Sequence, residues 1–211
     1  MPTIEQAREW YIEADTVHDF EHVMRVYRMA ERLANEEHAD LEIVRAAALL
    51  HDVTGSMPGS AERAEHHIAS AAFAGQALAA EGWQPERIAA VQHCIRAHRY
   101  RARLERPQSL EAKVLFDADK LDVLGAIGVA RTVAYAALAG QPFYLEPSEQ
   151  FLRTGQEAPG EPHSAYHEFL FKLRKIKDIL FTETGRTIAQ ERHRYLQGYF
   201  ERLGAEMRGE L

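Results

Sequence analysis

A short apolar helix that runs straight into two polar residues is the feature that most constrains the fold. Residues 43–50 read Ile-Val-Arg-Ala-Ala-Ala-Leu-Leu and are apolar almost all round, which predicts a helix buried among other elements. Asp40 is suited to cap its start, and Pro58-Gly59 follows its end. The residues directly after the apolar run are His51 and Asp52. Because buried polar groups need partners, this pair suits a divalent cation.

The pair also has a simpler interpretation. A helix can end in a cationic His that interacts with the helix dipole, followed by an Asp that caps the next turn. A His-Asp dipeptide taken alone favours that interpretation. Two further anomalies in the sequence favour a metal site instead.

The first anomaly lies in the helix expected from Glu111 to Arg131. One stripe of this helix, with steps of three and four residues, carries two acids among apolar residues: Ala112, Leu115, Asp119, Asp122, Ala126 and Val129. Such a face is costly without a cation. The alternative is a pair of acids bridged to Lys or Arg from another helix.

The second anomaly is His22, at the edge of the apolar face formed by Val23, Val26 and Tyr27. His18 lies one helical turn earlier, so two imidazoles can share this face. A lone His in such a position is more often a satisfied core residue. The metal interpretation therefore depends on the whole set, which combines His22 with the His-Asp pair and the later Asp.

Helical spacing dominates the chain, and no segment alternates for long in the manner of a strand. We therefore expect an all-α fold in a single domain. Helices are expected at about 3–14, 17–36, 41–51, 62–81, 85–98, 109–138, 163–181 and 185–207. Residues 1–139 would form the helical core, 140–162 a surface loop rich in Pro and Gly, and 163–211 C-terminal helices packed on the same domain.

Composition excludes several classes of protein. No apolar run approaches the roughly 18 residues that a membrane span needs, and the acidic N-terminus lacks the features of an export signal, so we expect a soluble, cytoplasmic protein. A net charge of -7 argues against duplex nucleic acid as a partner. Local arginines remain available for a small anion: Arg96, Arg99, Arg101 and Arg103. The lone Cys94 is expected to be a small buried hydrophobe.

Three stretches occur in an order that resembles the HD superfamily of metal-dependent phosphohydrolases: His22-Val-Met-Arg-Val26, then Ala47-Ala-Leu-Leu-His51-Asp52, then Ala118-Asp119-Lys120-Leu121. A closer resemblance is to a branch of small bacterial HD hydrolases. It is carried by His18-Asp-Phe-Glu-His22, Asp117-Ala-Asp119-Lys-Leu-Asp122 and Thr182-Glu-Thr-Gly-Arg186. The match spans about residues 10 to 207, and the ordered series is far more specific than any one dipeptide.

The resemblance implies a single HD-domain helical bundle with a C-terminal helical extension. It also implies metal ligands at His22, His51, Asp52 and Asp119, with His51 and Asp52 as the catalytic pair. His18 then becomes a neighbour of the site, because His22 has the family spacing to the following Arg-Val. Mixed nitrogen and oxygen ligation favours one transition-metal ion such as Mn(II).

The resemblance extends to two later histidines, His66 and His98. We expect them first as contacts to a substrate phosphate and second as ligands of a second metal, with His67 as the alternative to His66. Lys120, Arg99 and Arg131 are candidates to offset substrate charge. Asp117 and Asp122 would either orient ligands or lie on the helix surface, and for Asp122 we favour a role in the site. The substrate-binding set is thus His18, His66, His98, Lys120 and Asp122.

The function expected from these residues is hydrolysis of a phosphoanhydride or phosphomonoester bond in a small phosphorylated substrate, with a nucleotide favoured. A metal ion would polarise a phosphoryl oxygen and activate water. One alternative is a non-catalytic HD module that senses a ligand, although retention of all four ligands argues against it. Another is a di-iron HD oxygenase, which needs the extra histidines as ligands. Homodimerisation is left open.

Overall fold

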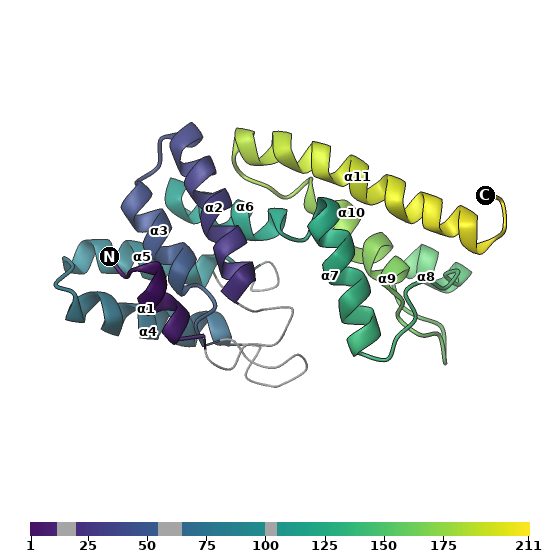
Figure 1. Cartoon of the computed structure of the whole chain (residues 1–211), viewed down its shortest axis with the longest axis horizontal. Helices are drawn as coiled ribbons and strands as arrows, with labels where there is room; N and C mark the ends of the chain where they lie inside the picture. Colours follow the sequence, from purple (N-terminus) through teal and green to yellow (C-terminus); the bar gives the residue numbers. More distant parts are fainter. Residues whose placement is uncertain (12–19, 55–64, 100–104) are drawn as a thin grey trace. The chain divides into compact units, whose positions relative to one another are not determined.

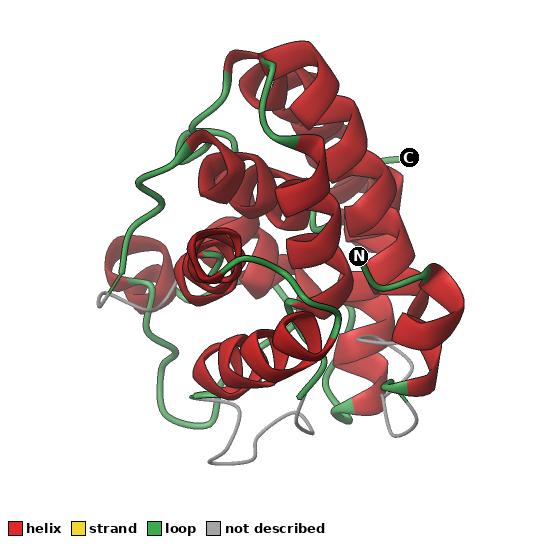
Figure 2. Ribbon diagram, turned by 90° about the vertical axis from the view of Figure 1, so that its left-hand side faces the viewer, coloured by secondary structure: helices red, strands yellow, loops and turns green. Residues whose placement is uncertain are grey.

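The structure is a computed structural model that describes residues 1–11, 20–54, 65–99 and 105–211. Within these ranges every regular element is helical and none is a strand (Figure 2). The all-α class predicted from the sequence is therefore confirmed. The chain forms two compact units, of which the first comprises Met1–Asp119 with Leu180–Gly185 and the second Lys120–Ile179 with Arg186–Leu211.

The first unit is built around α3, Leu41–Leu50, which packs against four neighbours (Figure 1). These are α1 (Ile4–Glu9), α2 (Phe20–Glu37), α4 (His66–Ala80) and α5 (Pro85–Ala97). From Ala46 to Leu50 every residue of α3 is fully buried, as its apolar sequence predicts. Most of α6, Leu110–Leu121, also belongs to this unit.

Asp40 fixes the start of α3, as expected. Its carboxylate accepts hydrogen bonds from the backbone N–H groups of Glu42 and Ile43. The same carboxylate pairs with the guanidinium of Arg87 in the first turn of α5, at 2.9 and 3.1 Å. These hydrogen bonds hold the pKa of Asp40 below its usual value. One side chain thus caps α3 and joins it to α5.

The segment of residues 180–185 is fastened to α6 by Asp117. This fully buried carboxylate accepts hydrogen bonds from the N–H groups of Phe181 and Thr182, at 2.9 and 2.7 Å, and from the Thr182 hydroxyl at 2.6 Å. A Cβ on Gly185 would lie 2.6 Å from the carboxylate, so only glycine fits there. The interpretation of Asp117 as a surface residue is wrong, because its partners come from a segment 64 or 65 residues away.

The second unit contains α7 (Gly125–Leu138), α8 (Glu149–Thr154), α9 (Ala165–Glu168), the π-helix η2 (Phe169–Leu173), α10 (Arg174–Ile176) and most of α11 (Glu183–Met207). Its core includes Phe169 of η2 stacked on Phe200 of α11, with ring centroids 4.8 Å apart. No single helix in the described ranges is long and apolar enough to cross a bilayer; α6 and α7 meet that test only as a bent pair.

Two of the sequence expectations that differ from the structure concern α7 and α8. The helix expected over 109–138 is two helices, because Gly125 adopts a φ of 70° after a turn at residues 122–124. Gly128 allows the close return of the chain, since a Cβ there would lie 2.3 Å from the carbonyl oxygen of Val123. The expected loop over 140–162 contains α8, which the Ser148 hydroxyl caps by accepting from Phe151 N–H.

We expect Asp40→Ala to destabilise the protein by about 1 kcal/mol through loss of the N-cap. Asp40→Asn should retain most of the capping contribution and lose the charge on the Arg87 pair. Because the folded-state pKa of Asp40 is lowered, any stability difference between wild type and the Asn variant should shrink as the pH falls through that pKa. Urea unfolding at several pH values measures both effects. Equal stability of the Ala variant and wild type would contradict the capping role.

Candidate metal centre

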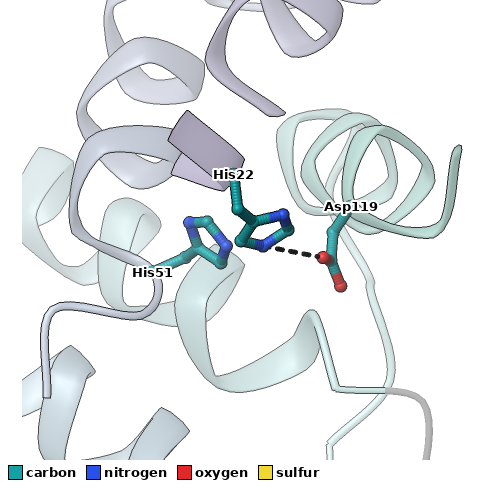
Figure 3. Close-up of side chains that lie close together, drawn as sticks. All are labelled: His22, His51 and Asp119. Atoms are coloured by element: carbon teal, nitrogen blue, oxygen red, sulfur yellow. Dashed lines mark ion pairs between the residues drawn. The ribbon is translucent and has the colours of Figure 1, made fainter. Parts of the chain in front are cut away.

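Four side chains from three parts of the first unit converge beside the end of α3. His22 comes from α2, His51 follows α3, and Asp119 comes from the last turns of α6 (Figure 3). Asp52 directly follows His51. His22 Nε2 lies 3.5 Å from Asp119 Oδ1 and 3.8 Å from Asp52 Oδ2. His51 Nε2 lies 3.6 Å from the same Asp52 oxygen. One ligand atom from each of His22, His51 and Asp119 fits within 4.8 Å of the others, which is the spacing of a metal site.

A second group of ligand atoms faces the other oxygen of Asp52. His66 Nε2 lies 3.2 Å and His98 Nε2 3.4 Å from Asp52 Oδ1. His66 is the first residue of α4, and His98 directly follows α5. The carboxylate of Asp52 therefore lies between two groups of imidazoles, with one oxygen directed to each.

Helix ends fix the tautomers of two of these histidines. His51 Nδ1 donates to the carbonyl of Ala48 at 2.8 Å, and His98 Nδ1 donates to the carbonyl of Ile95 at 2.6 Å. Each carbonyl belongs to the last turn of its helix, where backbone acceptors lack helical partners. When Nδ1 carries the proton, the lone pair remains on Nε2. Both rings thus present an acceptor atom to the Asp52 carboxylate.

Two buried atoms in the cluster test whether a cation fits. His51 Nε2 and Asp52 Oδ1 are buried and have no hydrogen bond of good geometry within the described residues. Leaving such groups unpaired is costly, and a divalent cation would satisfy both a lone pair and a carboxylate. Imidazole nitrogens combined with carboxylate oxygens are ligands that transition metals accept. The residues therefore fit a divalent metal.

The electrostatics agree with this donor set. Burial alone would raise the pKa of Asp52, but positive charge on the surrounding imidazoles, His51 first, lowers it well below its usual range; a divalent cation would supply that positive charge when the rings are neutral. Burial lowers the pKa of His98, despite the neighbouring carboxylate. The site thus presents an ionised carboxylate, and the shift at His98 favours a neutral imidazole, which are the protonation states that metal ligation requires.

Thr54 and Ser70 hold His66 against the end of α3, and sequence reasoning missed both. The Thr54 hydroxyl donates to the carbonyl of His66 at 3.0 Å, and Ser70 Oγ accepts from Thr54 N–H at 3.2 Å. Ser70 lies one turn after His66 and is fully buried. A hydroxyl one turn along from a candidate ligand, on an otherwise apolar helix, was the signal available in the sequence.

The sequence matches the HD domain family over residues 19–124, which includes every residue of the two ligand groups. The Bacillus subtilis protein YpgQ is 32% identical over 213 aligned residues, which cover 97% of this chain and 94% of YpgQ. This chain belongs to the HD superfamily. The resemblance stated from its motifs is confirmed.

Solved structures of HD proteins extend the similarity to nearly the whole chain. Bacillus subtilis YpgQ in complex with ADP matches with a TM-score of 0.72 and 29% identity, covering 97% of both chains. An HD-superfamily hydrolase from Bacillus thuringiensis matches with a TM-score of 0.72 and 29% identity, covering 97% of this chain and 94% of the other. The chain therefore has the fold of HD-superfamily hydrolases.

The remaining predicted residues of the HD site are placed as follows. His66 faces Asp52, whereas the adjacent His67 is buried and its Nδ1 has no hydrogen-bond partner in the described ranges. Lys120 follows Asp119 in α6 and is half-buried, and Asp122 lies in the turn after α6, where it pairs with Arg131. His18, Arg101 and Arg103 lie outside the described residues. Roles for Lys120 and Asp122 in substrate binding stay predictions.

We expect added Mn²⁺ to raise the melting temperature and a chelator to reverse the rise, because a cation that binds only the folded state stabilises it. At a concentration one hundred times the dissociation constant, the gain is about 2.7 kcal/mol. His51→Ala should abolish the rise. His38→Asn is a matched control, since His38 has a φ of 60°, which Asn tolerates. Elemental analysis should find about one ion per chain; indifference to Mn, Co, Ni and Zn would contradict the metal centre.

Proposed function

We propose that this protein is a metal-dependent phosphohydrolase that acts on a small phosphorylated substrate, with a nucleotide as the favoured class. The observation that carries the proposal is the convergence of His22, His51, Asp52 and Asp119, where His51 Nε2 and Asp52 Oδ1 are buried and have no hydrogen-bond partner among the described residues. The HD-superfamily hydrolase fold supports the reaction class. The structure of the similar YpgQ in complex with ADP supports a nucleotide as the ligand.

In this proposal, His22 Nε2, His51 Nε2, Asp52 and Asp119 hold one divalent ion, and Mn(II) is the favoured metal. When bound, such an ion would supply Lewis-acid chemistry toward a phosphoryl oxygen and would make water easier to deprotonate. The chain itself supplies orientation. The Ala48 carbonyl holds the ring of His51, and the two oxygens of Asp52 face opposite groups of imidazoles. The ligand side chains are thereby oriented before the substrate arrives.

His66 and His98 are the substrate-side residues of the proposal. Their Nε2 atoms lie near Asp52 Oδ1, whereas His51 Nε2 lies near Asp52 Oδ2. We assign them contact with the substrate phosphate, where a proton on Nε2 would make each ring a donor. Such a proton on His98 would add a positive charge, because its Nδ1 already donates to Ile95.

The second group of ligand atoms favours a second candidate, in which a second divalent cation binds Asp52, His66 and His98. One ligand atom from each of these residues lies within 4.8 Å of the others. With Nδ1 of His98 protonated, its Nε2 lone pair faces the oxygen of Asp52, and a cation between them would relieve the repulsion. Two ions per chain in the elemental analysis would support this candidate, and two irons with oxygen consumption would support an oxygenase.

We expect Asp52→Ala to lower hydrolysis by more than about 100-fold, the upper end of the loss seen when a residue that only supports a metal ligand is removed. A panel of nucleoside mono-, di- and triphosphates with Mn, Co, Ni, Mg or Zn identifies the substrate, and analysis of phosphate against pyrophosphate identifies the bond. Circular dichroism should show the helical content of wild type. Wild-type turnover in an Asp52→Ala protein that holds no metal would contradict the proposal.

A second pair of variants separates the two N-terminal histidines. His22→Ala should lose metal, because His22 Nε2 points directly at Asp119 and Asp52. His18→Ala should keep metal and show impaired turnover or a raised KM, if His18 contacts the incoming phosphate. Metal titration and steady-state kinetics of both variants distinguish the roles. The reverse pattern would reassign the ligand to His18.

A further inference from the structure

Tyr11 reaches the candidate metal centre from outside the segment that matches the HD family. The residue lies just beyond α1, whereas the family match begins at residue 19. Its hydroxyl donates to the carbonyl of Leu49 at 3.0 Å, across 38 residues of sequence. The hydroxyl also lies beside the backbone N–H of Asp52. An N-terminal side chain thus contacts the turn that carries His51 and Asp52.

The backbone carbonyl of Leu49 lies at a buried helix end and needs a hydrogen-bond donor. The last four carbonyls of a helix lack helical partners, and Leu49 of α3 is fully buried. The carbonyl just before it, that of Ala48, accepts from His51 Nδ1. Two successive carbonyls of the last turn therefore take side-chain donors, one from His51 itself and one from Tyr11. Any shift of this turn would move both the acceptor that fixes the His51 tautomer and the backbone of Asp52.

Tyr11 is held in place by the surrounding aromatic rings. Its ring lies 5.5 Å from that of Phe20, the first residue of α2 and two residues before His22. The neighbouring Trp10 contacts the ring of Phe73 in α4 at 5.3 Å. The segment that carries Tyr11 is therefore packed against the helices that supply His22 and His66.

We propose that Tyr11 is a positioning residue of the metal centre, which holds the last turn of α3 so that His51 and Asp52 meet the ion in the correct orientation. The inference rests on the proposed metal site but not on the hydrolysis of any particular substrate. It makes the N-terminal segment part of the functional unit, although that segment lies outside the family match.

The test compares Tyr11→Phe with Tyr27→Phe in the full-length protein. Both variants lose one hydroxyl, and that of Tyr27 lies beside Glu31 in α2, away from the ligand groups. We expect Tyr11→Phe to weaken Mn²⁺ affinity by about 10-fold or more, within the range for partners that orient metal ligands. The metal-induced rise in melting temperature should shrink at limiting Mn²⁺, and excess Mn²⁺ should restore kcat. Tyr27→Phe should bind Mn²⁺ within about twofold of wild type, as a substitution away from the site.

Two results would overturn the inference. One is a Tyr11→Phe protein with the Mn²⁺ affinity of wild type, and the other is a melting temperature lowered equally with and without Mn²⁺, which marks a purely structural role. If Tyr11→Phe weakens Mn²⁺ binding while wild type hydrolyses no nucleotide, the inference stands and the proposed phosphohydrolase function fails. If wild type hydrolyses nucleotides and both Tyr variants bind Mn²⁺ equally well, the inference alone fails.

Discussion

Burying the C-terminal end of α3 is the constraint on which the candidate site depends. A buried helix end brings unpaired carbonyls into the core, and here the chain continues into an imidazole and a carboxylate. His51 satisfies the carbonyl of Ala48, and Tyr11 satisfies that of Leu49. Within the described part of the chain, His51 Nε2 and one oxygen of Asp52 are then left without hydrogen bonds. The packing that buries the end of α3 therefore also leaves ligand atoms that a bound cation would stabilise.

Local sequence was sufficient to predict the parts of the site that depend on one helix at a time. The apolar run of α3 predicted its burial, Asp40 predicted its start, and the spacing of Asp119 from Leu115 and Ala112 predicted an inward-facing acid. All these features follow from helical periodicity and capping, which act over a few residues. The resemblance to HD hydrolases then grouped residues from separate helices into one ligand set.

What the sequence did not predict depends on contacts between distant segments or on backbone conformation. Asp117 takes its donors from residues 181 and 182, and Tyr11 reaches Leu49, so neither partner is visible in a local pattern. The choice between His66 and His67 required the phase of α4 relative to Asp52, which the local sequence does not give. The break between α6 and α7 depends on the positive φ of Gly125. The sequence did not predict it, because a glycine can also lie within a continuous helix.

The hydrogen bonds between Asp117 and residues 181–182 mean that the segment matching the HD family does not contain all the contacts of its own helices. Residues 180–185 belong to the first unit although the chain on both sides of them belongs to the second. A fragment cut after residue 124 would keep all the residues of both ligand groups. In that fragment the carboxylate of Asp117, two residues before Asp119, would be buried without the N–H and hydroxyl groups that stabilise its charge. The short segment of residues 180–185, far along the chain, thus completes the hydrogen bonding of the helix that carries the final ligand.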